Sequence, residues 1–184
     1  MSLVVIEGSN GTGKSTIIKE IKKIYNITDK KSVPDWFRKY IDFARSCPFE
    51  IQKEIYKIGH DANYFECNKN EDYIFDRYYY STIIRINYGL GLSPEETVTE
   101  ILSLKNIPDI IFLLQANLDL IKKRLIERDN FVFDINFYNY ENEVFRYLSN
   151  KCDIMHVIDN SNDIDLTVNK ISSIIDEKTK IRKR

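Results

Sequence analysis

The feature that most constrains the fold is an apolar run that leads directly into a glycine-rich loop and then into a helical pattern. Residues 3–6 are Leu-Val-Val-Ile, a β-branched run typical of a strand buried on both faces of a parallel sheet. A loop from Gly8 to Ser15 follows, and apolar residues then recur with helical spacing between residues 17 and 24. A strand, a tight loop and a helix in this order are typical of α/β folds.

The loop matches the phosphate-binding pattern G-x-x-x-x-G-K-[ST] in full. Its glycines let the backbone curl, so that successive N–H groups and the start of the helix face phosphate oxygens. Lys14 is expected to be exposed and to reach the β- and γ-phosphates, and Ser15 to supply a hydroxyl ligand to Mg²⁺. The sequence therefore predicts a site for ATP and Mg²⁺. The residues expected to contact the nucleotide are Gly8, Ser9, Asn10, Gly11, Thr12, Gly13, Lys14, Ser15 and Thr16.

Strands alternate with helices along the rest of the chain, which predicts one α/β domain over residues 1–184. We expect a single-domain P-loop NTPase with a parallel five-stranded sheet and helices on both faces. Further strands are predicted at residues 73–76, 109–114 and 154–158. Helices are predicted to begin near Asp35 and Ser93 and to cover residues 50–65, 118–127 and 164–175. The basic residues 178–184 are expected to form a frayed, solvated tail.

Composition and motifs exclude several other classes. The formal net charge of −1 argues against a nucleic-acid binder, which needs a basic surplus to neutralise phosphates. No apolar run approaches the ~20 residues of a membrane span, and no secretory signal begins the sequence. With three widely spaced cysteines, a cytoplasmic location is expected. A GTPase switch is disfavoured, because no glycine has an aspartate three residues before it.

A second group of functional residues is Asp76-Arg77-Tyr78, which ends the strand predicted at residues 73–76. The carboxyl ends of parallel strands form the edge at which such sheets bind ligands. Asp76 can hold the water shell of Mg²⁺ there, and Arg77 can bridge two phosphate groups with its bidentate guanidinium. We therefore expect Asp76 beside Ser15 at the metal, and Arg77 beside Lys14 in catalysis.

In these motifs the chain resembles the thymidylate kinase family of nucleoside monophosphate kinases. The loop with its flanks, Glu-Gly-Ser-Asn-Gly-Thr-Gly-Lys-Ser-Thr, is similar to that family's EGxDGxGKST. The Asp-Arg-Tyr segment, followed by Ser81, resembles its DRY…S motif. The remaining similar segments, in the family's order, are residues 108–113, 123–128 and 156–159.

The resemblance implies roles for individual residues. Arg77 would clamp the acceptor phosphate. Arg124 and Arg128, in a lid of about residues 124–139, would close over ATP, because the loop has glycine at position 11 where a basic residue can stand. Asn162 lies in the loop after the last strand, where the family contacts adenine. The family also implies a homodimer.

The acceptor pocket departs from the family pattern. Asn10 stands where the family has an acid. Aligning residues 62–66 with the family's A-[ND]-R-x-E places Tyr64 at its substrate arginine and His60 at its base-stacking phenylalanine. The expected substrate-binding residues are Asn10, His60, Tyr64, Arg77, Tyr78 and Arg85. With aromatic walls but without that arginine, we expect a pyrimidine acceptor and loosened base specificity.

The function expected from the sequence is ATP-dependent phosphorylation of a nucleoside monophosphate, thymidylate or a related pyrimidine deoxynucleotide. Its partners are then small-molecule nucleotides, with no nucleic acid and no membrane. Two alternatives stay open. A deoxynucleoside kinase shares the loop but would need a carboxylate base in an acidic motif of the second strand and an arginine segment similar to Glu-Arg-Ser. Asp35 beside Trp36 could be misread as that base, whereas Asp76-Arg77-Tyr78 favours the monophosphate kinase. A regulatory protein would bind ATP without transferring phosphate.

Overall fold

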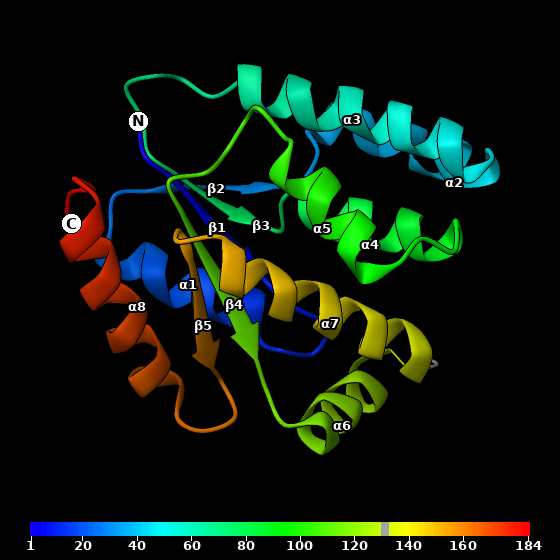
Figure 1. The fold of residues 1–184 in the computed structure, drawn as a ribbon. Helices are drawn as coiled ribbons and strands as arrows, with labels where there is room; N and C mark the ends of the chain where they lie inside the picture. Colours follow the sequence, from blue (N-terminus) through cyan, green and yellow to red (C-terminus); the bar gives the residue numbers. More distant parts are fainter. Residues whose placement is uncertain (130–132) are drawn as a thin grey trace.

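The structure is a computed structural model that describes residues 1–129 and 133–184. In this part of the chain a five-stranded parallel sheet has the order β2-β3-β1-β4-β5 (Figure 1). The strands are β1 (Leu3–Glu7), β2 (Thr28–Lys31), β3 (Tyr73–Asp76), β4 (Ile110–Gln115) and β5 (Met155–Asp159). The helices are α1 (Lys14–Ile24), η1 (Asp35–Tyr40, a 3₁₀ helix), α2 (Ile41–Ser46), α3 (Phe49–Phe65), α4 (Tyr79–Gly89), α5 (Pro94–Leu102), α6 (Leu118–Asp129), α7 (Ile135–Lys151) and α8 (Ile164–Lys178).

Helices cover both faces of the sheet, as predicted. Alternate side chains of a strand point to opposite faces, so Val4 and Ile6 pack against α1 and α8 while Leu3 and Val5 pack on the other side. The second face is covered chiefly by α4, α5 and α7 (Figure 1). Because β1 is central and buried at every residue, the loop that follows it opens at the middle of the sheet edge.

One strand was not located from the sequence. β2 has the sequence Thr-Asp-Lys-Lys and is largely exposed, because it is an edge strand that pairs only with β3. It carries no apolar alternation, which is the signal by which half-buried strands are recognised. Its register places Lys31 opposite Asp76, so this edge strand delivers a lysine to the carboxyl end of the sheet.

The helix expected to begin near Asp35 is different in the structure. Residues 35–40 form the 3₁₀ helix η1, whose N-cap is Pro34 without a side-chain hydrogen bond, and α2 then begins at Ile41. Trp36, Tyr40 and Phe43 are exposed rather than buried. The aromatic spacing had suggested one amphipathic helix, but the segment packs only Phe37 and Ala44 inward. By contrast, the start at Ser93 is confirmed by a capping box with Glu96.

The expected frayed tail was wrong. Ile181 is buried, Asn26 N donates to Arg182 O at 2.9 Å, and Arg184 N donates to Ile24 O at 2.9 Å. The final residues therefore pair with the segment that links α1 to β2. Their charge had suggested a solvated tail, but alternating residues can bury an isoleucine while the basic side chains stay outside. No helix in the described ranges is both long and apolar enough to cross a bilayer.

Truncating the chain after Lys180 is expected to lower the thermal midpoint by about 5–10 °C, because burial of an isoleucine contributes about 1.5–3 kcal/mol and two backbone hydrogen bonds are lost with it. The measurement is thermal unfolding followed by circular dichroism. Lys180→Ala, at an exposed neighbouring position, is the matched control and should unfold as the full chain does. An unchanged midpoint in the truncated chain would show that the docked tail adds no stability.

Candidate phosphate-binding site

The glycine-rich loop connects the end of β1 to the first turn of α1. Gly13 caps the helix with a φ of 92°, a left-handed conformation that favours glycine. A Cβ at this position would also lie 2.5 Å from Asn160 Nδ2. Glycine is therefore required here for both backbone and space, and the first N–H groups of α1 are left facing the loop.

Lys14 is buried by the loop, which corrects the expectation that it is exposed. Its ammonium donates to the carbonyl oxygens of Gly8 at 2.7 Å and Ser9 at 2.8 Å. Burial, together with the positive charge of Arg77, lowers the pKa of Lys14 to about 7 against the opposing effect of Asp76. Near neutral pH the ammonium group of Lys14 is therefore close to losing its proton.

Two side chains that could offer oxygen ligands to a metal, Ser15 and Asp76, meet where α1 begins and β3 ends. Ser15 Oγ donates to Asp76 Oδ2 at 3.2 Å, and Lys31 Nζ forms an ion pair with the same oxygen at 2.6 Å. A hydroxyl beside a carboxylate is a donor set that suits a hard cation such as Mg²⁺. Ser15 and Asp76, paired from the sequence alone, are brought together by the structure, and they fit the metal expected at an ATP site.

Arg77 occupies a strained turn that directs its side chain toward the loop. Its φ is 70°, a left-handed value that costs a non-glycine residue about 1–2 kcal/mol. The turn is held because Arg77 N donates to Ile6 O at 3.0 Å and Tyr78 N donates to Glu7 Oε1 at 2.8 Å. The guanidinium donates to Ser81 Oγ and to Asn10 Oδ1, both at 2.8 Å. Asn10, expected at the substrate, holds this arginine.

Two buried carboxylates flank the same guanidinium. Arg77 Nη1 lies 4.0 Å from Glu7 Oε2 and 3.9 Å from Glu141 Oε1. Burial raises the pKa of Glu7 above its ordinary value, and Arg77 opposes the shift. Neither glutamate had been assigned a role from the sequence. Glu7 stood next to the motif and could have been noticed, whereas nothing in the sequence around Glu141 signals the site.

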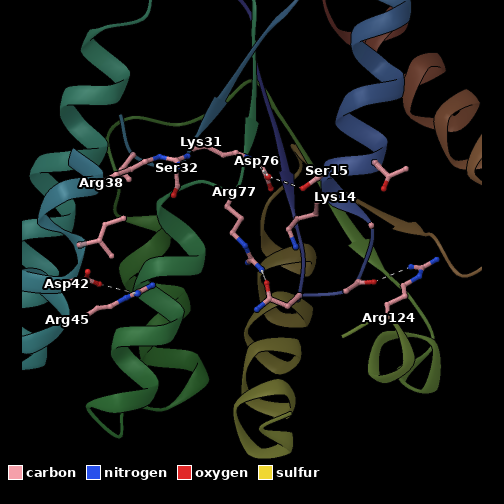
Figure 2. A pocket seen from close by; sticks show the side chains of 16 residues that line it. Lys14, Ser15, Lys31, Ser32, Arg38, Asp42, Arg45, Asp76, Arg77 and Arg124 are labelled. Carbon is pink, nitrogen blue, oxygen red and sulfur yellow. Dashed lines mark hydrogen bonds and ion pairs between the residues drawn. The ribbon is translucent and has the colours of Figure 1, made fainter. Parts of the chain in front are cut away.

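A cavity of about 870 Å³ lies in front of these groups. Figure 2 shows Arg124 on one side of it, Arg38 and Arg45 on the other, and Lys14 and Arg77 between them. Lys31, Arg38 and Arg45 were missed from the sequence. They belong to the unrecognised strand β2, to the 3₁₀ helix η1 and to the short helix α2.

The ATP-side residues expected from the resemblance are placed as follows. Arg124 Nη1 donates to Gly11 O at 3.1 Å, so this side chain lies against the loop. The side chain of Arg128 and residues 130–132 of the expected lid lie outside the described part of the chain. Asn162 is exposed, and the buried Asn160 instead donates to Thr12 O at 2.8 Å. The loop after β5 therefore reaches the glycine-rich loop through Asn160, and the adenine contact of Asn162 stays a prediction from the resemblance.

The base pocket expected from alignment is not assembled at this cavity. His60 is buried with its ring centroid 4.5 Å from that of Tyr79, and burial lowers its pKa to about 3. Tyr78 is buried and donates its hydroxyl to Asn106 O, and Tyr64 packs against the same apolar cluster. Arg85 lies over the ring of Phe137. None of the four lines the cavity, because α3 and α4 pack against each other through this region.

No known protein family matches the chain in sequence, and no curated protein does. Two solved structures of deoxyadenosine kinase from M. mycoides are similar in fold. One, with the products dCMP and a flexible dCDP bound, has a TM-score of 0.65 and 24% identity. The other, with bound dATP, has a TM-score of 0.68 and 20% identity. Each likeness covers 95% of this chain and 99% of the other. At these identities the likeness shows a shared fold and no more.

The pKa of Lys14 leads to a test of the nucleotide site. Because phosphates stabilise the charged ammonium, ATP binding at pH 8 is expected to take up close to one proton (roughly 0.9), and the affinity should fall as the pH rises above about 7. Calorimetry in buffers of different ionisation enthalpy measures the uptake. Lys14→Ala should bind ATP more weakly and without proton uptake. Wild-type binding with no uptake at pH 8 would contradict this assignment.

Proposed function

We propose that the chain transfers a phosphoryl group from ATP to a nucleoside monophosphate, with a pyrimidine deoxynucleotide as the acceptor. The observation that carries this proposal is the charge of the cavity. Among the described residues that line it, six are basic and two are acidic. The basic residues are Lys14, Lys31, Arg38, Arg45, Arg77 and Arg124, and the acidic ones are Asp42 and Asp76.

The distribution of this charge supports an anionic acceptor. Lys14 and Arg124 lie at the glycine-rich loop, where the triphosphate is expected, whereas Arg38 and Arg45 lie across the cavity (Figure 2). Arg77 stands between the two groups. The distant arginines pair only with the exposed carboxylates of Asp35 and Asp42 among the described residues, and a nucleoside hydroxyl would add no charge there. A monophosphate supplies an anion that a guanidinium binds in bidentate fashion.

The transfer then needs no strong base. A monophosphate oxygen is already anionic, so the protein has only to align donor and acceptor and to neutralise charge. Lys14 would contact the transferred phosphate, and Arg77 would bridge it to the acceptor. Ser15 and Asp76 would hold Mg²⁺, which supplies positive charge to the triphosphate. Residues 124–139 are proposed to close over ATP and exclude water. Pairing of two copies remains a prediction from the family resemblance.

A deoxynucleoside kinase is the second candidate, and the shared fold with deoxyadenosine kinase favours it. It requires a carboxylate that takes a proton from the acceptor hydroxyl. Asp35 does not line the cavity; its side chain is exposed and paired with Arg38. Asp42 lines the cavity but is also exposed and pairs with Arg45, and Asp76 is occupied by Lys31. β2 ends with Lys31 and is followed by Ser32, and these two residues suit an anion better than a hydroxyl.

The identity of the acceptor's nucleobase is supported by fewer observations than the presence of a phosphate on the acceptor. The chain resembles thymidylate kinases in its motifs, and one structural neighbour holds dCMP and dCDP. We therefore propose a pyrimidine deoxynucleotide and expect several bases to be accepted, because the residues expected to discriminate between them lie away from the cavity.

A panel of acceptors tests the proposal. Steady-state rates with ATP and Mg²⁺ would be measured for thymidylate, deoxyuridylate, deoxycytidylate, the purine monophosphates and the matching nucleosides. Monophosphates are expected to exceed nucleosides in kcat/KM by at least about 100-fold, because two charge-assisted hydrogen bonds contribute about 1.5–3 kcal/mol each. Faster turnover of nucleosides would replace the proposal with the second candidate. ATP binding with no turnover of any acceptor would favour the regulatory alternative.

Arg77→Ala is expected to lower kcat by about 100-fold or more while leaving ATP affinity within about threefold, because the arginine acts on the acceptor and the transition state. Arg85→Ala is the matched control: this arginine also lies on the α4 side but outside the cavity, and its loss should leave both constants near wild type. A higher KM for the acceptor in Arg85→Ala would instead support the base pocket that was expected from the sequence.

A further inference from the structure

Glu141 is a buried carboxylate that belongs to none of the motifs of the site. It lies on α7, 132 residues after Ser9, and its side chain is only 5% exposed. An isolated ionised carboxylate in such a place is costly, so its partners must compensate for the lost hydration. Those partners are two residues of the candidate site.

One carboxylate oxygen of Glu141 accepts a hydrogen bond from the glycine-rich loop. Ser9 Oγ donates to Glu141 Oε2 at 2.5 Å. The carbonyl of Ser9 accepts from Lys14 Nζ at 2.8 Å and from Thr12 Oγ1 at 2.9 Å. Glu141 therefore holds the same turn whose carbonyl oxygen holds the phosphate-binding lysine.

The other oxygen faces the arginine. Glu141 Oε1 lies 3.9 Å from Arg77 Nη1, the nitrogen that also donates to Ser81 Oγ. Glu7, at the end of β1, lies 4.0 Å from this nitrogen. Glu7 is also tied to the backbone of the turn through Tyr78 N, but no such bond occupies Glu141 among the described residues. The second carboxylate thus acts on the guanidinium and on the loop together.

We infer that Glu141 is a positioning residue for phosphoryl transfer, which fixes the guanidinium of Arg77 relative to the loop that holds Lys14. The two cations come from different strand ends, and Glu141 joins them through a third element, α7. A shift of about 1 Å in such a group can cost about 10²-fold in rate, so a support of this kind affects turnover without touching the substrate. The inference rests on the proposed function.

Glu141→Gln removes the charge and keeps an oxygen that can accept from Ser9. It is expected to lower kcat by about 10- to 100-fold, with the KM of the acceptor within about threefold of wild type. Glu143→Gln, two residues away on the same helix and exposed, is the matched control and should behave as wild type. A kcat of Glu141→Gln within twofold of wild type would overturn the inference.

A double-mutant cycle separates positioning from a general structural effect. If Glu141 acts through Arg77, Glu141→Gln should cost less than about threefold in kcat when Arg77 is already Lys. An equal loss in both backgrounds would overturn the inference. Should Glu141→Gln unfold at the assay temperature, Glu141→Asp takes its place: it keeps the charge with a shorter reach, and a folded variant with wild-type kcat would also overturn it.

A measurement without turnover keeps the two proposals distinguishable. Rotation of the Arg77 guanidinium can be followed by nitrogen-15 magnetic resonance, with the signal assigned by its loss in Arg77→Lys. Glu141→Gln is expected to speed this rotation about tenfold or more, and Glu143→Gln to leave it unchanged. An unchanged rotation overturns the inference about Glu141, whereas an inactive wild type with faster rotation in the variant overturns only the proposed function.

Discussion

Two positive charges, on Lys14 and Arg77, are held close together at the end of β1, and the site depends on how their repulsion is compensated. The charge of Arg77 helps to lower the pKa of Lys14, because a second positive charge nearby disfavours the charged ammonium. Three carboxylates offset it: Glu7 from β1, Asp76 from β3 and Glu141 from α7. Phosphate groups would complete the balance, because they add negative charge where the two cations converge.

Backbone geometry brings the cations to this point. β1 pairs in parallel with β3 and β4, so the chain leaves all three strands at the same edge of the sheet. At the end of β1 the chain turns through glycines, and at the end of β3 it turns through Arg77 in a left-handed conformation. Strain of this kind persists only where the surroundings hold it, and the hydrogen bonds from Arg77 N and Tyr78 N do so. The helices that pack apolar side chains on both faces of the sheet provide rigid support for these turns.

The side of the cavity proposed to hold the acceptor is built by different means. Its basic side chains come from the polar edge strand β2 and from the η1–α2 segment, which leaves several aromatic side chains exposed. Arg38 and Arg45 are therefore more exposed than Arg77, with 52% and 70% of their side chains accessible against 23%. Solvent screens their charges, so each contributes less per contact than the less exposed Arg77. The proposed transfer point is thus more enclosed than the proposed entrance for the acceptor.

The sequence alone determined the parallel sheet, the loop of residues 8–15 and the pairing of Ser15 with Asp76. These features are encoded locally, by β-branched runs, by glycine where φ is positive, and by an acid at the end of a buried strand. The tertiary structure alone decided the burial of Lys14, the delivery of Lys31 by β2, the contact of Asn160 with the glycine-rich loop, and the approach of Glu141 to Arg77. The packing of the helices also decided that His60 and Tyr78 are buried. A polar side chain far along the chain has no local signal for its partner, because the partner is chosen by how the helices pack on the sheet.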